Sequence, residues 1–368
     1  MKQEDLKTNA SQMLAHFLLE ATPIDVSLIG NGLINDTYKV TTAEAGKPDY
    51  VLQRINNNVF TDVDLLQHNI ETVTAHIRQK LEARGEKDID RKVLRFIKTD
   101  DGKTYYQSAD GNYWRVSAFI PNAVSYEEVN SQHANECGLA FGDYENMLAD
   151  LKEPLGETIP RFHDMELRLQ QLNQAIVLDK AKRYHKVEGM VRELLADADD
   201  MCLAERLYRE GKLPKRACHC DTKVNNMMFD KTTGEFLLVI DLDTTMPSFV
   251  FSDYGDFLRS AANATAEDDA NLDNVKLKWD IIEAFTKGYV HSAGKFFTDT
   301  ERDNLPFAAA LFPYMQSVRF LTDYLNGDVY WKVKYSEHNL DRARNQQRLY
   351  QLMKEGEQRI AEIVASVR

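Results

Sequence analysis

The chain has 368 residues, of which 43% are hydrophobic and 28% charged, and its formal net charge is −13. This length and composition predict a soluble globular protein of two lobes or domains. The acidic balance argues against nucleic acid or an anionic membrane as a main partner, because both select a basic face. With only four cysteines, no signal peptide and no apolar run of about 18 residues, we expect a cytoplasmic protein without a disulfide scaffold.

The first 119 residues predict a small β-rich lobe behind a leading helix. Apolar residues recur at helical spacing over 4–20, and Pro23 ends that helix. A strand, a glycine turn and a second strand cover 26–40, and a third strand covers 50–55. Backbone N–H groups at the tip of such a hairpin can bind phosphates, although most glycine turns are only turns. The candidate phosphate-binding residues are Gly30, Asn31, Gly32, Asn35 and Thr37.

A long helix and three short strands complete this lobe. The apolar spacing predicts the helix over 62–84, and Asp-Gly turns separate strands over 93–97, 103–107 and 113–119. The sequence Phe-Ile-Pro-Asn at 119–122 is typical of a hinge, because proline stiffens the chain and ends the strand.

From about residue 125 onward the chain is mostly helical. Pro306 and Pro313 are expected to break the helix over 299–326. Strands with one inserted helix, followed by a run of helices, indicate an α+β fold with a lobe over 1–119 and a larger helical lobe over 120–368. The other expected helices cover 131–152, 164–180, 181–211, 272–293 and 339–365, and a further one opens near residue 251.

The stretch over 218–243 carries the chemistry. It reads His219-x-Asp221-x-x-x-x-Asn226, then a turn at 232–234, then an apolar run that ends in Asp241. This is the layout of a kinase catalytic loop and its metal-binding strand, although a turn followed by an ordinary buried strand has similar letters. Asp221 would accept the proton of a substrate hydroxyl, and Asn226 and Asp241 would hold Mg²⁺ against the phosphates of ATP. We expect His219 to brace the loop by hydrogen bonds.

Four further residues near this loop can be interpreted. Lys223 is placed to reach the transferred phosphate, or else it is a solvated loop lysine. Asp243 either assists a second metal ion or caps the following turn. Asp256 and Arg259 are expected to form a structural pair that fixes the catalytic loop.

The nucleotide-binding groups are less complete. In protein kinases a lysine on the third strand holds the α- and β-phosphates, but this strand reads Gln53-Arg54 and has no lysine. Gln53 facing the nucleotide would supply a hydrogen bond without charge, whereas Arg54 would keep the charge. Glu71 or Glu82 could be the ion-pairing glutamate of the long helix. The candidate adenine contacts are backbone groups of the hinge at Phe119 and Ile120.

These features together resemble the aminoglycoside phosphotransferase-like small-molecule kinases, and most closely the N-acetylhexosamine 1-kinases. The likeness covers nearly the whole chain. Its motifs are Gly-x-Gly-x-Ile-Asn at 30–35, Tyr-x-Leu-Gln at 50–53, Asp-Thr-Lys-x-Asn-Asn at 221–226, Ile-Asp-Leu-Asp-Thr at 240–244, Asp-x-Gly-Asp at 253–256, Arg-Phe-Leu-x-Asp-Tyr-Leu-x-Gly-Asp-Val-Tyr at 319–330, and Tyr-x-Glu-His-Asn-Leu at 335–340.

The resemblance implies a bilobal protein-kinase-like fold and phosphorylation of GlcNAc or GalNAc at the anomeric hydroxyl, with ATP and Mg²⁺. It implies Asp221 as base, Asn226 and Asp241 as metal ligands, and Arg319 and Tyr330 as sugar contacts. Gln53 in place of the lysine fits this subgroup. An arginine at the acceptor would repel a cation such as choline, whereas it suits the oxygens of a sugar and its amide.

Two other hypotheses remain at this point. The acceptor could be methylthioribose, homoserine, choline or a fructosamine. The absent strand lysine would also allow a non-catalytic ATP-binding pseudokinase, although Asp221, Asn226 and Asp241 are all present. We expect a monomer or a homodimer whose partners are its small-molecule substrates.

Overall fold

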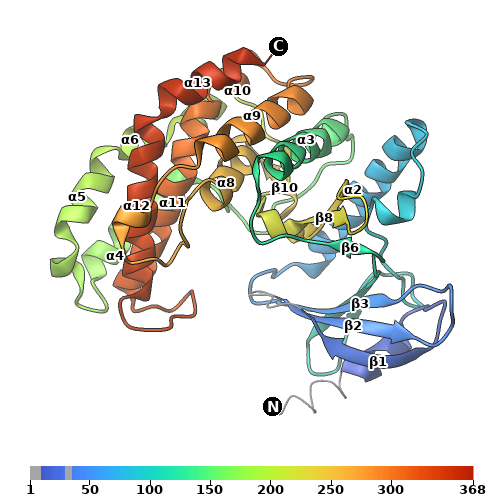
Figure 1. Ribbon diagram of the computed structural model, residues 1–368. Helices are drawn as coiled ribbons and strands as arrows, with labels where there is room; N and C mark the ends of the chain where they lie inside the picture. Colours follow the sequence, from blue (N-terminus) through green and yellow to red (C-terminus); the bar gives the residue numbers. More distant parts are fainter. Residues whose placement is uncertain (1–9, 30–34, 368) are drawn as a thin grey trace. The chain divides into compact units, whose positions relative to one another are not determined.

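The computed structural model describes residues 10–29 and 35–367 and divides the chain into two compact units (Figure 1). The first unit contains the chain up to residue 124 together with two later segments, 151–160 and 228–245. The second unit contains 125–150, 161–227 and the chain from 246 onward. The expected boundary at 119/120 lies near the first of these divisions, and the two later segments group with the first unit.

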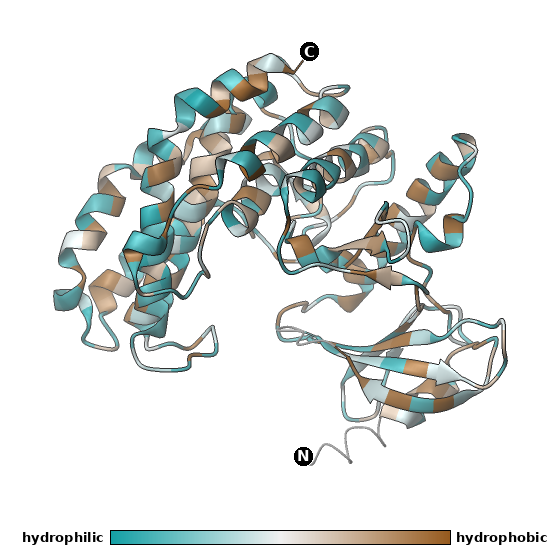
Figure 2. Cartoon of the chain, in the orientation of Figure 1, coloured by the Kyte–Doolittle hydropathy of each residue, from teal (hydrophilic) through white to brown (hydrophobic). Residues whose placement is uncertain are grey.

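An antiparallel sheet forms the body of the first unit, in the order β1-β2-β3-β5-β4. Its strands alternate between hydrophobic and hydrophilic residues (Figure 2), as expected where one face is buried. Tyr38, Leu52 and Trp114 lie on the face that packs against the described part of the leading helix. The strands are Pro23–Leu28 (β1), Asp36–Thr42 (β2), Tyr50–Ile55 (β3), Tyr106–Gln107 (β4) and Tyr113–Ala118 (β5).

The opposite face of this sheet carries a polar row. Thr37 on β2 pairs with Gln53 on β3, which pairs with Arg115 on β5. Helix α2 (Val63–Ala83) begins at the N-cap residue Asp62, whose carboxylate accepts the N–H of Leu65 at 2.9 Å, so the predicted helix over 62–84 is confirmed.

The prediction of a strand over 93–97 is wrong. This segment forms only an isolated bridge from Phe96 to Ser117. The physical reason is that it shares one edge of β5 with β4, so each segment pairs with only a few residues of that strand. The expected strand over 103–107 is correspondingly reduced to β4.

The segment over 228–245 adds a small sheet of order β6-β8-β9 to the first unit, followed by a turn. Asp230 shapes its hairpin by accepting the N–H groups of Thr232 and Thr233, as the predicted turn at 232–234 requires. Its elements are Ala123–Val124 (β6), Met227–Asp230 (β8), Phe236–Val239 (β9) and the 3₁₀ turn Leu242–Thr244 (η5).

The second unit is mainly helical, with a two-stranded sheet of Arg216–Cys218 (β7) and Met246–Ser248 (β10). No helix in the described part of the chain combines the length and apolar character that a membrane span needs. Its helices are Ser131–Leu148 (α3), Met165–Leu178 (α4), Tyr184–Lys186 (η3), Glu188–Ala196 (α5), Ala198–Met201 (α6), Leu203–Arg209 (α7), Val224–Asn226 (η4), Phe251–Ala261 (α8), Leu272–Asn274 (η6), Trp279–Ala293 (α9), Asp299–Asp303 (α10), Leu305–Asn326 (α11), His338–Glu355 (α12) and Glu357–Ser366 (α13).

Two helix predictions need correction. The single helix expected over 181–211 is instead the run η3, α5, α6 and α7. Pro306 lies in the first turn of α11, where proline is tolerated, and Pro313 lies inside α11 without ending it. Burial of nearly every residue around Pro313 compensates for its missing backbone hydrogen bond.

Helices α3, α8 and α9 of the second unit pack closely against one another. A Cβ atom on Gly138 of α3 would lie 2.3 Å from the carbonyl oxygen of Phe285 on α9, so only glycine allows this approach. Beside it the rings of Phe257 on α8 and Phe285 stack at 3.8 Å. Helix α8 is thereby fixed, and α8 holds the catalytic loop.

Candidate functional site

The predicted base Asp221 lies in the second unit, in the loop between β7 and η4. Its Oδ1 is 2.8 Å from the ammonium of Lys223. Burial disfavours the Lys223 charge, but Asp221 and, more weakly, Asp256 outweigh it, so the pKa of Lys223 is raised. The Asp221 side chain therefore lies beside a cation, in an arrangement that suits a base next to a transferring phosphate.

Helix α8 holds this loop through two buried carboxylates. Both oxygens of Asp253 accept backbone N–H groups, from His219 and Cys220, at 2.7 Å each. Cys220 has a positive φ of 62°, a conformation that costs free energy for a residue with a side chain. The two hydrogen bonds from Asp253 compensate for that strain and fix the peptide groups just before Asp221.

The second α8 carboxylate confirms the structural pair predicted from sequence. Asp256 accepts the N–H of Thr222 at 3.2 Å and contacts Arg259 at 2.9 Å. Burial alone would raise the pKa of Asp256, but the charges of Arg259 and Lys223 lower it. The fully buried ring of His219 accepts the N–H of Asp221 at 3.3 Å, so its predicted bracing role is also confirmed.

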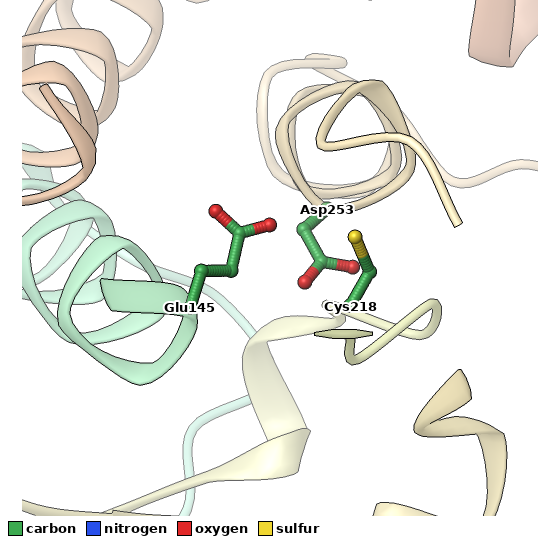
Figure 3. Close-up of side chains that lie close together, drawn as sticks. All are labelled: Glu145, Cys218 and Asp253. Carbon is green, nitrogen blue, oxygen red and sulfur yellow. The ribbon is translucent and has the colours of Figure 1, made fainter. Parts of the chain in front are cut away.

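A third acidic side chain, missed from sequence, lies behind Asp253. Glu145 on α3, Cys218 on β7 and Asp253 on α8 point toward one another (Figure 3), with their ligand-type atoms within 4.8 Å. Glu145 Oε2 accepts the Tyr289 hydroxyl at 2.7 Å, and its buried Oε1 meets no donor within the described ranges. Burial raises the pKa of Glu145 well above its ordinary value, and the carboxylate of Asp253 adds to the rise, so the protonated acid is favoured beside Asp253.

This assignment gives a pH-dependent prediction for Glu145→Gln. A folded-state pKa above the unfolded value of 4.5 means that the contribution of protonated Glu145 is complete below that pH and is lost as the pH rises toward the folded pKa. A glutamine amide donates to Asp253 at every pH. The stability of wild type relative to Glu145→Gln should therefore fall as the pH rises from about 5 to about 9.

The measurement is thermal unfolding of both proteins across that pH range. Asp253, Tyr289 and Glu301, which are the ionisable groups that act on Glu145, are present in both proteins, so the difference reports Glu145 together with the changes it causes in the titration of Asp253 and Tyr289. A difference that does not change with pH would contradict a protonated Glu145.

Asn226 ends the catalytic loop with an oriented carboxamide. Its Nδ2 donates to the backbone oxygen of Asp221 at 2.8 Å. This bond commits the amide nitrogen to the loop and turns the carboxamide oxygen to the other side. Oxygen is the ligand atom that Mg²⁺ prefers, so Asn226 fits a magnesium ligand.

The other two predicted metal ligands belong to the first unit and differ in exposure. Asp241 is exposed and adopts a positive φ of 58° at the start of η5. Asp243 is buried, accepts from Asn35 Nδ2 at 2.7 Å and lies 2.6 Å from a guanidinium nitrogen of Arg115. The exposure of Asp241 suits a ligand for a metal ion. The two carboxylate oxygens of Asp243 contact Asn35 and Arg115.

The predicted nucleotide residues form part of the polar row on the sheet. Gln53 Nε2 donates to Thr37 at 3.2 Å, and Gln53 Oε1 accepts from Arg115 at 2.9 Å. Arg54 points to the other face and pairs with Asp36 at the surface. Gln53, and not Arg54, therefore shares the face of Thr37 and Arg115. Predicted residues Gly30, Asn31 and Gly32 lie outside the described residues.

Three further predictions for the first unit can be placed. Asn35 Oδ1 accepts the N–H of Asn56 at 2.9 Å, so both ends of its side chain bond to protein groups. At the hinge, the Phe119 N–H donates to the Asp49 carbonyl at 2.8 Å. Ile120 is buried against Leu237 and Leu238 of β9.

The predicted sugar contacts lie in the second unit. Arg319 on α11 places its guanidinium 5.3 Å from the ring of Phe162 and 5.2 Å from that of Trp331. Tyr330 is 61% exposed, yet its loop is held, because Asp323 accepts the N–H groups of residues 329, 330 and 331 at 2.9–3.1 Å. Gly327, with a φ of 94°, ends α11 before this loop.

Arg168 on α4 is a further cation that sequence reasoning missed. Its side chain donates to the Phe162 carbonyl at 2.5 Å, while its buried Nε has no acceptor in the part of the chain described. Burial lowers the pKa of Arg168 to about 10, and nearby Arg319 adds to this effect. Burial likewise lowers the pKa of Arg319. Beside the catalytic loop, the charge of Arg259 lowers this pKa further and that of Asp256 raises it. Within residues 10–29 and 35–367, neither Arg168 nor Arg319 forms an ion pair with a carboxylate.

Comparison with known proteins agrees with this geometry. A model described as the phosphotransferase enzyme family matches residues 25–289. An aminoglycoside phosphotransferase from Alicyclobacillus acidocaldarius has a TM-score of 0.61 at 13% identity, covering 96% of each chain. An amicoumacin kinase in complex with AMP-PNP and Ca²⁺ has a TM-score of 0.59 at 14% identity over 95% of this chain and 96% of its own. A choline kinase from Cryptosporidium parvum has a TM-score of 0.56 at 11% identity over 99% and 100%. These likenesses confirm the predicted α+β kinase-like fold.

Proposed function

Because this chain belongs to the phosphotransferase enzyme family, we propose that it transfers the γ-phosphoryl group of ATP to the anomeric hydroxyl of an N-acetylhexosamine, GlcNAc or GalNAc. The observation that carries the proposal is the braced catalytic loop. It presents Asp221 at 2.8 Å from the Lys223 ammonium and leaves the carboxamide oxygen of Asn226 for a metal ion.

Each residue has a chemical role in this proposal. Asp221 accepts the proton of the anomeric hydroxyl, which is more acidic than an ordinary alcohol. Lys223 offsets negative charge on the transferring group. Asn226 and Asp241 are the oxygen ligands for Mg²⁺, which when bound neutralises phosphate charge. Asp243 acts mainly by fixing the turn that carries Asp241.

The first unit supplies the proposed nucleotide contacts. Thr37 and Gln53 lie in the polar row, and the hinge backbone at Phe119 and Ile120 would bind adenine. Because the Phe119 N–H already donates to Asp49, we assign the hydrogen bonds to adenine to the Phe119 carbonyl and the Ile120 backbone. The proposed phosphate contacts are Gly30, Asn31, Gly32 and Asn35.

The charge of the second unit favours a neutral acceptor over a cationic one. Arg168 and Arg319 are partly desolvated guanidiniums without carboxylate partners in the described residues, and they would repel an ammonium group. A sugar offers such guanidiniums uncharged hydroxyl and amide oxygens as acceptors, of the same kind as the Gln316 amide oxygen that accepts from Arg319 at 2.9 Å. Tyr330, on a loop held by Asp323, is placed to cover the sugar ring.

The experiment offers ATP, Mg²⁺ and a panel of acceptors, and detects the product by phosphorus NMR. GlcNAc and GalNAc should yield a sugar 1-phosphate, whereas glucosamine, which differs from GlcNAc by the missing acetyl group and carries an ammonium, should react poorly. Choline, ethanolamine, methylthioribose, homoserine and a fructosamine complete the panel. Turnover of one of these but not of an N-acetylhexosamine would overturn the proposed acceptor, and no turnover of any would overturn the activity.

Arg319→Met tests the acceptor contact in the same assay. Loss of a hydrogen bond to a charged donor should raise the KM for the sugar about 10-fold or more, with the KM for ATP unchanged. The matched control is Arg192→Met, an exposed arginine on α5 of the same unit. An equal rise in both KM values would indicate a structural defect instead.

A further inference from the structure

Strand β3 has no lysine and carries the neutral Gln53 on the face of the polar row. A cation for that face, Arg115, lies on the neighbouring strand β5. Arg115 on β5 lies directly opposite Gln53 on β3 and is only 2% exposed. Its Nε donates to Gln53 Oε1 at 2.9 Å and its Nη1 to Gln67 Oε1 on α2 at 3.2 Å. The same Nη1 lies 2.6 Å from Asp243 Oδ1, off the line of a good hydrogen bond, so this contact is an ion pair in character.

Arg115 links the sheet to helix α2, as the strand lysine of a kinase links its sheet to the neighbouring helix, but the partner is different. In kinases that lysine pairs with a glutamate of the helix next to the sheet. Here the helix side chain is the neutral Gln67, while Glu71 accepts from Thr104 instead. Among the described residues of the first unit, the charge of Arg115 is therefore balanced by Asp243 alone.

Asp243 lies in the turn that carries the proposed metal ligand Asp241. The Asp243 carboxylate is held by Arg115 and Asn35, and its carbonyl accepts from Thr158 at 2.8 Å. Two residues on, Asn69 of α2 donates to the carbonyl of Thr245 at 2.9 Å. Exposed Asp241 therefore projects from a turn fixed on several sides, and Arg115 is its only cationic support among the described residues.

We propose that Arg115 is the positioning cation of the metal-binding turn over 241–245, in a chain whose third strand has no lysine. Arginine suits this place because its planar fork can serve two amide oxygens and a carboxylate at once, which an ammonium on β3 would do less well. Through Asp243 it orients Asp241, and its positive charge lies beside the proposed nucleotide residue Gln53. This inference rests on the Mg²⁺ and ATP part of the proposed function and is independent of the acceptor.

The test compares wild type with Arg115→Met and with the double variant Gln53→Lys/Arg115→Met, which returns a cation to β3. Two quantities are measured without acceptor: the Mg²⁺ dependence of AMP-PNP binding by calorimetry, and thermal stability without metal or nucleotide. In Arg115→Met the Mg²⁺ concentration for half-maximal binding should rise roughly 10- to 100-fold, as when a support of a metal ligand is lost. The double variant should return to within about threefold of wild type, because a lysine at 53 is longer than the glutamine that already reaches the guanidinium.

Arg54→Met is the matched control, since Arg54 is next to Gln53 on β3 but pairs with Asp36 on the other face. It should leave both quantities unchanged. If Arg115→Met does not fold, recovery of folding and Mg²⁺-dependent binding in the double variant supports the proposal, and no recovery overturns it. Folded Arg115→Met with wild-type Mg²⁺ dependence also overturns it. Wild type that fails to bind AMP-PNP overturns the proposed function itself, and this inference with it.

Discussion

Asp221→Asn is expected to reduce kcat by roughly 10²–10⁴-fold, the usual contribution of a positioned general base. The asparagine keeps the size of the side chain but cannot accept the hydroxyl proton. It also removes the carboxylate that contacts Lys223 at 2.8 Å, so the lysine is left beside a neutral amide. Because Asp221 binds the proton that moves in the reaction, the loss should fall on kcat while the KM for ATP changes by less than about threefold.

The measurement is steady-state kinetics with the acceptor that gives the highest turnover. The control is Asp199→Asn, the same chemical change at a side chain that is 100% exposed in the same unit. Its activity should stay within about twofold of wild type, as for most surface substitutions. Wild-type turnover by Asp221→Asn would remove the central residue of the proposed mechanism.

Asp253→Asn is expected to destabilise the protein by about 2–4 kcal/mol and to abolish most activity, because it breaks hydrogen bonds made to a buried charge. Both carboxylate oxygens accept backbone N–H groups at 2.7 Å, and an amide retains only one oxygen. Its NH₂ group would face either the N–H of His219 or that of Cys220. The strained Cys220, with its φ of 62°, would lose a hydrogen bond that holds it, and Asp221 would move with it.

Thermal unfolding followed by far-ultraviolet circular dichroism tests this prediction, since most of the helices belong to the second unit. Asp199→Asn again serves as control. Full stability with lost activity would mean that Asp253 acts in catalysis without bracing the loop. Full stability and full activity would contradict the assignment of Asp253 altogether.

The two variants separate the chemistry from its support. Asp221→Asn should lose turnover with little change in unfolding temperature, because its side chain is partly solvated. Asp253→Asn should lose both. Arg115→Met should change the Mg²⁺ requirement of nucleotide binding, which neither of the other two substitutions addresses directly.

The sequence by itself determined the features that depend on local pattern. Spacing within one loop and one hairpin predicted Asp221, Asn226 and Asp241 as site residues, because a kinase loop and its strand are contiguous in the chain. Helical periodicity and an N-cap aspartate predicted α2 to within one residue at each end. Periodicity failed at 93–97, where the segment shares an edge of β5 with β4 and forms only a bridge. It also failed at 181–211, where several short helices replace the single long one.

Tertiary structure alone decided which distant side chains support those residues. Arg115 meets Gln53, 62 positions away, only because β5 pairs with β3. Glu145 meets Asp253 only because α3 and α8 pack behind β7. Neither Arg115 nor Glu145 lies in a local motif, since pairing and packing set such contacts without regard to distance along the chain. Burial then determined their chemistry. It pairs Arg115 with Asp243, and it raises the pKa of Glu145.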